Sequence, residues 1–200
     1  WFDGARLVVV SPDGNVRVLS KGLHSACDPD VSFDGQRVLF AGKLERESRW
    51  RLWEVGLDGQ GLRAVSPEAI EARSPIYVST LFTLDSPEPW FTTVFVGRDA
   101  TVNEAGRASA SSLYNVKLDG GELRRLTFNP NRNFDPFQMW DGRVIYSAER
   151  YPNPPGVGGG RVGLYAIHME GADMELYGGE LGGRIQQMGC ATERGLVIFI

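Results

Sequence analysis

Short apolar runs, separated by turns rich in glycine and proline, are the dominant pattern along the chain. Within these runs the apolar residues either alternate with polar ones or continue for four to six positions, as in "RVLFAG" from Arg37 to Gly42. Both patterns predict β-strands when turn residues bound them. Helical periodicity occurs at one place, 66–73, where Ser66 is a possible N-cap and Pro67 suits the first helical position. We therefore expect an all-β chain with one or two helical turns.

A hairpin recurs along the chain. The segment "LWEVGLDGQGLRAVS" (52–66) reappears as "LYNVKLDGGELRRLT" (113–127) and, more weakly, as "LYAIHMEGADMELYG" (164–178). Each copy has a strand, an Asp-Gly or Glu-Gly turn and a second short strand, and the glycine supplies the positive φ that a tight hairpin needs. A second hairpin precedes each copy. It is clearest in "DPDVSFDGQRVLFAG" (28–42) and "FDPFQMWDGRVIYSA" (134–148).

The repeating unit is thus four antiparallel strands in sequence, which is typical of a β-propeller blade. A sandwich would not need nearly identical hairpins at a fixed phase, and a solenoid would have shorter repeats. We predict a partial β-propeller of three complete blades and two half blades. The approximate blade boundaries are 1–20 (partial), 28–66, 74–127, 134–178 and 184–200 (partial).

The short apolar runs predict the strands of each unit. They are 5–10 and 16–20; 30–33, 37–41, 50–55 and 62–66; 76–82, 90–96, 112–117 and 123–127; 136–139, 143–147, 163–168 and 174–177; and 185–190 and 196–200. The pattern is cut at both ends. We therefore expect a single propeller segment that the remainder of a longer chain closes into a ring.

Composition excludes some partners. The chain has 200 residues and a formal net charge of -4, whereas proteins that bind nucleic acid usually carry a basic patch. No run of 18 apolar residues exists, so no membrane span is predicted. Cys27 and Cys190 can pair only if the fold brings their Cα atoms within about 7 Å. Neither belongs to a C-x-x-C-H haem attachment motif.

Three aspartates, Asp28, Asp30 and Asp34, resemble a ligand cluster but lack the spacing of an EF-hand. A structural interpretation accounts for each of them. Asp28 precedes a proline and should lie in an extended entry turn, because the residue before proline avoids the α region. Asp30 can accept backbone N–H groups near the strand start. Asp34 and Gly35 should form the turn of the first hairpin.

The other candidate motifs are weak. His24 and Cys27 would supply two ligands where structural zinc takes four. Gly158, Gly160 and Gly163 spell G-x-G-x-x-G, but a strand follows them where a dinucleotide site needs a helix, so we expect a flexible loop. G-x-S-x-G is absent. We therefore expect no catalytic, cofactor-binding or metal-binding residue in this segment.

Binding is expected mainly in one loop. The polar segment from Arg98 to Ser111 is long, and long loops on a rigid scaffold are frequent binding sites. The large aromatic residues should instead fill the interfaces between blades. These residues are Trp50, Trp53, Trp90, Phe91 and Trp140.

The repeat resembles the TolB-type, WD40-like (PD40) propeller repeat. The matching residues are Asp28, Pro29, Ser32, Asp34, Gly35, Leu39 and Phe40 in the first half and Leu118, Asp119, Gly120, Leu126 and Thr127 in the second. This resemblance covers nearly the whole chain and implies the fold rather than a particular function.

A narrower resemblance is to the propeller, or middle, domain of hydrazine synthase alpha subunit-like proteins. It depends on "STLFTLDSPEPWFTTVFVG" (79–97) and "NRNFDPFQMWDGRVIYSAER" (131–150). The resemblance implies a periplasmic or extracellular segment of a larger exported bacterial protein. We expect a scaffold that binds a protein or ligand without catalysis. The alternative is the middle domain of a c-type haem redox protein whose haem sites lie outside this chain.

Overall fold

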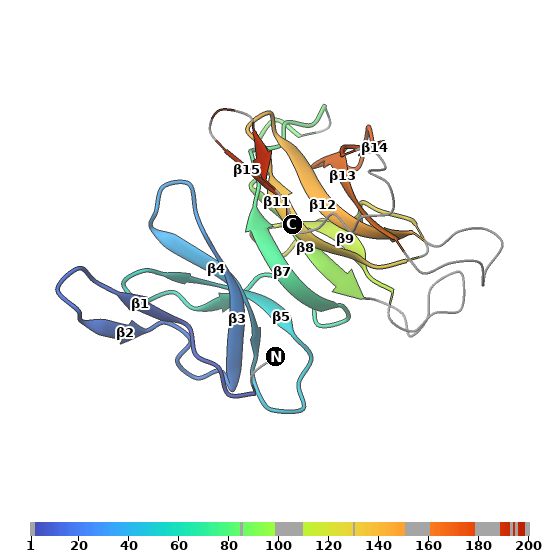
Figure 1. Cartoon of the computed structure of the whole chain (residues 1–200). Helices are drawn as coiled ribbons and strands as arrows, with labels where there is room; N and C mark the ends of the chain where they lie inside the picture. Colours follow the sequence, from blue (N-terminus) through green and yellow to red (C-terminus); the bar gives the residue numbers. More distant parts are fainter. Residues whose placement is uncertain are drawn as a thin grey trace.

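The chain folds into five antiparallel β-sheets that follow one another around a common centre (Figure 1). The computed structural model describes residues 3–84, 86–98, 110–129, 131–150, 161–178, 189–192, 194 and 196–198. Three sheets have four strands each, and the first and last have two. The predicted partial propeller of three complete blades and two half blades is therefore confirmed.

The strands of each sheet neighbour one another in chain order. The first half blade contains β1 (Val8–Val10) and β2 (Val16–Val18). Blade two contains β3 (Ser25–Val31), β4 (Arg37–Lys43), β5 (Arg51–Gly56) and β6 (Arg63–Ala64). Blade three contains β7 (Glu71–Tyr77), β8 (Thr92–Arg98), β9 (Ser112–Lys117) and β10 (Arg124–Arg125). Blade four contains β11 (Asn133–Gln138), β12 (Arg143–Arg150), β13 (Arg161–His168) and β14 (Glu175–Leu176). The last half blade contains β15 (Cys190–Ala191) and β16 (Val197–Ile198).

The first strand of each blade lies at the centre of the arrangement. β7 packs against β3 on one side and β11 on the other, and β11 packs against β15 (Figure 1). These inner strands bring residues from successive blades together. In blade two the β3–β4 and β5–β6 turns lie at one end, which we call the hairpin end, and the β4–β5 turn and the link to β7 lie at the other.

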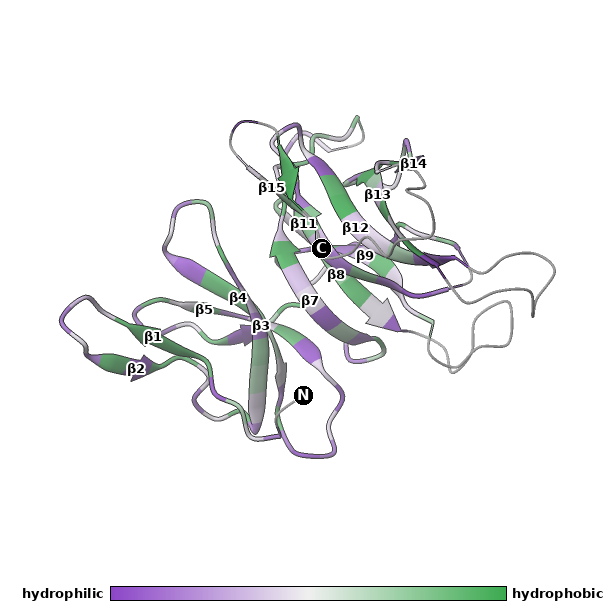
Figure 2. Cartoon of the chain, viewed as in Figure 1, coloured by the Kyte–Doolittle hydropathy of each residue, from purple (hydrophilic) through white to green (hydrophobic). Residues whose placement is uncertain are grey.

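The core is divided among the interfaces between neighbouring sheets. In β4, Val38 and Phe40 pack towards the first half blade, whereas Leu39 between them packs towards blade three. In β8, Phe95 joins the cluster with blade two, whereas Val94 joins the cluster with blade four. Both faces of these strands are buried, which explains the continuous apolar runs and the green stretches along them in Figure 2.

A buried hydroxyl group ends each of the first three units. The Oγ of Ser66 accepts the backbone N–H of Leu52 at 2.9 Å, and the Oγ1 of Thr127 accepts that of Leu113 at 2.8 Å. Ser20 does the same for the N–H of Leu7 at 3.0 Å. The repeated Ser or Thr thus binds the third strand of its own sheet, in which a backbone donor would otherwise be unpaired.

The predicted helix at 66–73 is wrong. The Ser66 hydroxyl accepts the backbone N–H of Leu52 in the sheet, so it does not cap a helix. Residues 68–70 form a turn, and β7 begins at Glu71. Glu71 pairs with Arg98 of β8, and Ile70 is buried between blades two and three. Strand pairing and burial therefore override the local helix signals, and the described residues contain no helix.

The inner strands begin earlier than predicted because each contains a β-bulge. β3 starts at Ser25, and its register shifts between Cys27 and Asp30. Asp28 has a φ of 53°, so the predicted extended conformation before proline is wrong. Ser74 and Asp135 precede prolines at the same place in β7 and β11, with φ values of 47° and 51°. Asp and other short polar residues tolerate this left-handed conformation at a bulge.

The predicted Asp-Gly turns are confirmed at Gly35, with a φ of 67°, and Gly120, with a φ of 90°. We expect Gly35→Val and Gly120→Val each to lower the free energy of unfolding of the propeller by more than about 1 kcal/mol, because β-branched residues tolerate positive φ poorly. The effect should be larger at Gly120, where a Cβ would lie 3.3 Å from the Val65 carbonyl oxygen.

Urea denaturation of the full-length protein measures this effect. Gly163→Ala is the matched control, because Gly163 lies in β13 and its added Cβ would have only ordinary contacts, the nearest at 3.6 Å. Unchanged unfolding midpoints in both valine variants would contradict the turn assignment.

Candidate functional site

The aspartates of blade two bind the next blade. Asp28 Oδ2 accepts Nε of Arg73 at 2.9 Å and the backbone N–H of Ser74 at 3.0 Å. Asp30 Oδ2 accepts the backbone N–H of Tyr77 at 2.7 Å. Ser74 lies within the shift in register between β7 and β8, and Tyr77 follows this shift. The prediction that Asp30 accepts a backbone N–H group is therefore confirmed, whereas Asp28, which is not in the predicted extended turn, binds Arg73 and Ser74; both contacts cross a blade interface.

The environments of these carboxyl groups differ. Burial raises the pKa of Asp30 more than the Tyr77 N–H lowers it. Asp34 lies in the exposed turn, where the hydroxyl of Ser32 donates to it at 2.6 Å and is the main cause of its lowered pKa. The N–H of Gln36 also donates to Asp34, at 3.0 Å. Asp34 thus holds its own hairpin together, as predicted.

The two potential metal ligands of blade two have other partners. His24 Nε2 lies 2.7 Å from Oδ1 of Asp3, and the Cys27 thiol points to the carbonyl of Ala41 at 3.8 Å. Burial, followed by the charge of Asp28, raises the pKa of Cys27 to about 12. Both Cys27 and Cys190 are free thiols. In the described ranges no three His, Cys, Asp or Glu residues are placed to share a metal ion.

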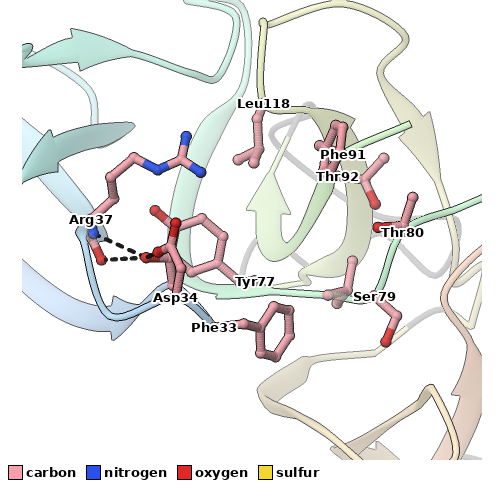
Figure 3. A pocket seen from close by; sticks show the side chains of 11 residues that line it. Phe33, Asp34, Arg37, Tyr77, Ser79, Thr80, Phe91, Thr92 and Leu118 are labelled. Atoms are coloured by element: carbon pink, nitrogen blue, oxygen red, sulfur yellow. Dashed lines mark hydrogen bonds between the residues drawn. The ribbon is translucent and has the colours of Figure 1, made fainter. Parts of the chain in front are cut away.

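Two cavities adjoin at the hairpin end of blades two and three. The first has a volume of about 470 Å³, and Phe33, Tyr77, Val78 and Phe91 are among its lining residues. The second has a volume of about 560 Å³. Arg37, Phe91 and Leu118 line both cavities, so the two are neighbours on the surface. We call the two together the hairpin groove; Figure 3 shows its first part.

A buried carboxylate contacts three of the residues that line the hairpin groove. Glu54, on β5, is 3% exposed and accepts the hydroxyl of Tyr77 from blade three at 2.9 Å. Arg63 forms an ion pair with Glu54, and Nη1 of Arg37 lies 3.7 Å from it. Burial, and then the charge of Glu54, raises the pKa of Tyr77. Arg63 also donates to the carbonyl of Leu118, so it joins the two blades.

The groove corrects one sequence prediction about aromatic residues. Trp90 is buried in the interface between blades three and four, and Trp53 packs against the core of blade two, as expected. Phe91 and Trp140 are 63% and 70% exposed, so the prediction that they fill interfaces is wrong. Their positions near the hairpin ends place both rings beyond the edge of the packed sheets. Phe33, at 75% exposed, occupies the same position in its hairpin as Trp140.

A separate cavity of about 420 Å³ lies at the opposite end of the blades. Its lining includes Arg98 and Ser111, which flank the loop predicted as a binding site; residues 99–109 of that loop lie outside the described ranges. Trp50 also lines it, with the guanidinium of Arg73 4.3 Å from its ring centre. Asp135 also lines this cavity. Burial, followed by the charge of Asp28, raises the pKa of Asp135. Gly158 and Gly160 lie outside the described ranges as well.

The lining of the hairpin groove contains groups that suit binding. Its lining offers aromatic faces, serine and threonine hydroxyl groups and the guanidinium groups of Arg37 and Arg63. Neither His24 nor His168 is among the lining residues of the three cavities. A pocket of several hundred cubic ångströms with mixed apolar and polar walls suits a side chain or a small ligand.

Comparisons with known proteins agree with the fold. No known family model matches the chain. The chain is 25% identical over 228 residues to hydrazine synthase subunit alpha of Kuenenia stuttgartiensis. The matched region covers 90% of this chain and 28% of that protein. The chain therefore spans less than a third of this relative's length.

Solved structures give the same answer. Hydrazine synthase of K. stuttgartiensis superposes with a TM-score of 0.79 at 22% identity, covering 99% of this chain and 32% of that one. A putative TolB from Agrobacterium tumefaciens has a TM-score of 0.60 at 16% identity, covering 86% and 55%. The chain is a propeller segment whose fold resembles those of TolB and hydrazine synthase. In the described part of this propeller, no helix is long and apolar enough to cross a membrane.

Sequence reasoning missed the cluster of Arg37, Glu54, Arg63 and Tyr77 at the hairpin groove. One signal was available: Glu54 stands in the strand "LWEVG" where the other two copies have Asn115 and Ala166. A charged residue at a position that is buried in the repeat needs a partner. The sequence does not reveal that Tyr77 and Arg63 are those partners.

Proposed function

We propose that this chain is a propeller scaffold within a larger exported bacterial protein, in the periplasm or outside the cell. It contributes no catalysis and presents the hairpin groove to a protein or ligand. The remainder of its own chain closes the ring. The observation that carries this proposal is the pair of exposed phenyl rings, Phe33 and Phe91, on opposite sides of one groove. Exposed apolar side chains that gather in a groove are typical of interaction surfaces.

Site-specific photo-crosslinking in the native host tests the proposal. A benzophenone amino acid at position 33 or 91 of the full-length protein should form a discrete adduct with a partner or with another segment of its own polypeptide. Phe128 is the control position, because its ring is 68% exposed and lines none of the three cavities. Absence of adducts at positions 33 and 91, or the same adducts at position 128, would exclude a contact in the groove.

The similarity to hydrazine synthase subunit alpha favours a second candidate function. In this case the propeller is the middle domain of a redox protein that binds c-type haem outside this chain. Cys27 and Cys190 do not fit a haem attachment motif, so this chain does not hold the haem itself. Haem staining of the full-length protein after denaturing electrophoresis distinguishes the two functions, because covalently attached haem remains bound to the denatured protein. A stained band supports the redox function, and an unstained band excludes it.

A further inference from the structure

The hairpin groove has an apolar end with room for one large side chain. Phe33 reaches it from the first hairpin of blade two, and Phe91 reaches it from the start of β8 in blade three (Figure 3). Val78 and Leu118 add aliphatic surface to the lining. Burying a large apolar side chain there would remove both phenyl rings from water, which favours binding.

Beside the groove, two guanidinium groups face one buried carboxylate. Glu54 is the single buried carboxylate between two guanidinium groups, and it lies closer to Arg63 than to Arg37. The side chain of Arg37 is 47% exposed and lines both cavities of the groove. One carboxylate balances one guanidinium, so Arg37 keeps capacity for a second anion.

Acidic side chains also lie near Arg37, and its charge contributes to the lowered pKa of Asp34. Asp34 accepts the Ser32 hydroxyl and the Gln36 N–H within its own turn. Asp119 Oδ1 accepts the backbone N–H of Gly121 at 2.9 Å. Glu88 lines only the second cavity, which Lys117 also lines. The groove therefore places a half-exposed guanidinium group, at 3.7 Å from Glu54, next to an apolar pocket.

We propose that the hairpin groove binds an extended segment of a protein partner in which a large apolar side chain lies close to an acidic one. The apolar side chain enters between Phe33 and Phe91, and the carboxylate accepts hydrogen bonds from Arg37. The Tyr77 hydroxyl on Glu54 keeps this charge cluster in place before the partner arrives. This inference rests on the proposed function and adds the chemistry of the partner.

Selection of phage-displayed random peptides on the full-length protein tests the inference. Wild-type protein should enrich peptides that combine a large apolar residue with a nearby Asp or Glu. Arg37→Gln should keep the apolar preference and lose the acidic one. The affinity of a selected peptide should fall about tenfold or more in this variant, since a hydrogen bond to a charged group is lost. Phe33→Ser should lose the apolar preference.

Blade four offers matched controls. Arg143 follows its hairpin turn as Arg37 does, but it is paired with Asp141 at 2.7 Å and with Glu175. Trp140 occupies the position of Phe33. Neither Arg143 nor Trp140 lines the hairpin groove, so Arg143→Gln and Trp140→Ser should select the same peptides as wild-type protein.

Three results would overturn the inference. The first is a selection on wild-type protein that yields no shared peptide motif, and the second is a preference for acidic residues that persists in Arg37→Gln. The third is a loss of the acidic preference in Arg143→Gln that is as large as the loss in Arg37→Gln. Thermal melts of all variants show that each is folded. The crosslinking result separates the two proposals. Adducts at positions 33 and 91 together with a motif that lacks acidic residues would refute this inference and leave the scaffold function standing.

Discussion

Asp28→Ala is expected to lower the free energy of unfolding of the full-length propeller by about 3–5 kcal/mol, the cost of leaving a largely buried ion partner unpaired. The side chains of Asp28 and Arg73 are only 15% and 16% exposed. The substitution also leaves the backbone N–H of Ser74 without its acceptor and puts alanine at a φ of 53°. Urea denaturation that reports on the propeller measures the loss.

Asp28→Asn divides this effect into its parts. Asparagine tolerates positive φ and can still accept the Ser74 N–H, so only the charge paired with Arg73 is lost. We expect a destabilisation between that of the alanine variant and zero. Asp34→Asn is the control from the same motif, because Asp34 is exposed, and it should change stability by less than about 1 kcal/mol. Equal effects at positions 28 and 34 would contradict the contact across the blades.

Phe95→Ala should have an effect of similar size, a loss of about 3–5 kcal/mol, as for other large aromatic residues in close-packed cores. Phe95 is 0% exposed in the middle of β8. Its ring stacks on that of Tyr114, with centroids 5.8 Å apart, and belongs to the cluster that also contains Leu39 and Leu52 of blade two. The truncation therefore opens a cavity at the interface between two blades rather than inside one sheet.

The slope of the urea transition adds information about this interface. If blades two and three unfold together, the midpoint falls in Phe95→Ala while the slope stays constant. Phe82→Ala is the matched control, because Phe82 is 78% exposed, and it should remain within about 0.5 kcal/mol of the wild-type value. A loss below 1 kcal/mol in Phe95→Ala would show that the two sheets are not packed closely there.

Local patterns account for the parts of the fold that were predicted correctly. The Asp-Gly turns at Gly35 and Gly120 need only the positive φ of glycine, and the strands need only alternation or continuous burial. The predicted helix at 66–73 failed because Ser66 binds the N–H of Leu52, a contact that the local sequence does not reveal. The predicted first residues of the inner strands were wrong because of the bulges, where Asp28 and Asp135 interrupt the pairing of β3 with β4 and of β11 with β12.

The candidate site was beyond local patterns. Glu54 and Tyr77 are 23 residues apart in sequence and meet because two sheets stack at that point. Phe33 and Trp140 occupy equivalent positions in the repeat, yet only Phe33 lines the hairpin groove. The reason is that blade three, which carries Phe91, is the neighbour of blade two on that side. Residue type alone did not distinguish exposed aromatic residues from those that fill interfaces.

The sequence by itself determined the four-stranded unit, its repetition and its tight turns, because side-chain alternation and glycine conformation act within a few residues. Only the tertiary structure decided what the aspartates of "DPDVSFDG" bind. Asp28 is 45 residues from Arg73, and Asp30 is 47 residues from Tyr77. Contacts over that separation depend on how neighbouring sheets pack, and so does the hairpin groove between them.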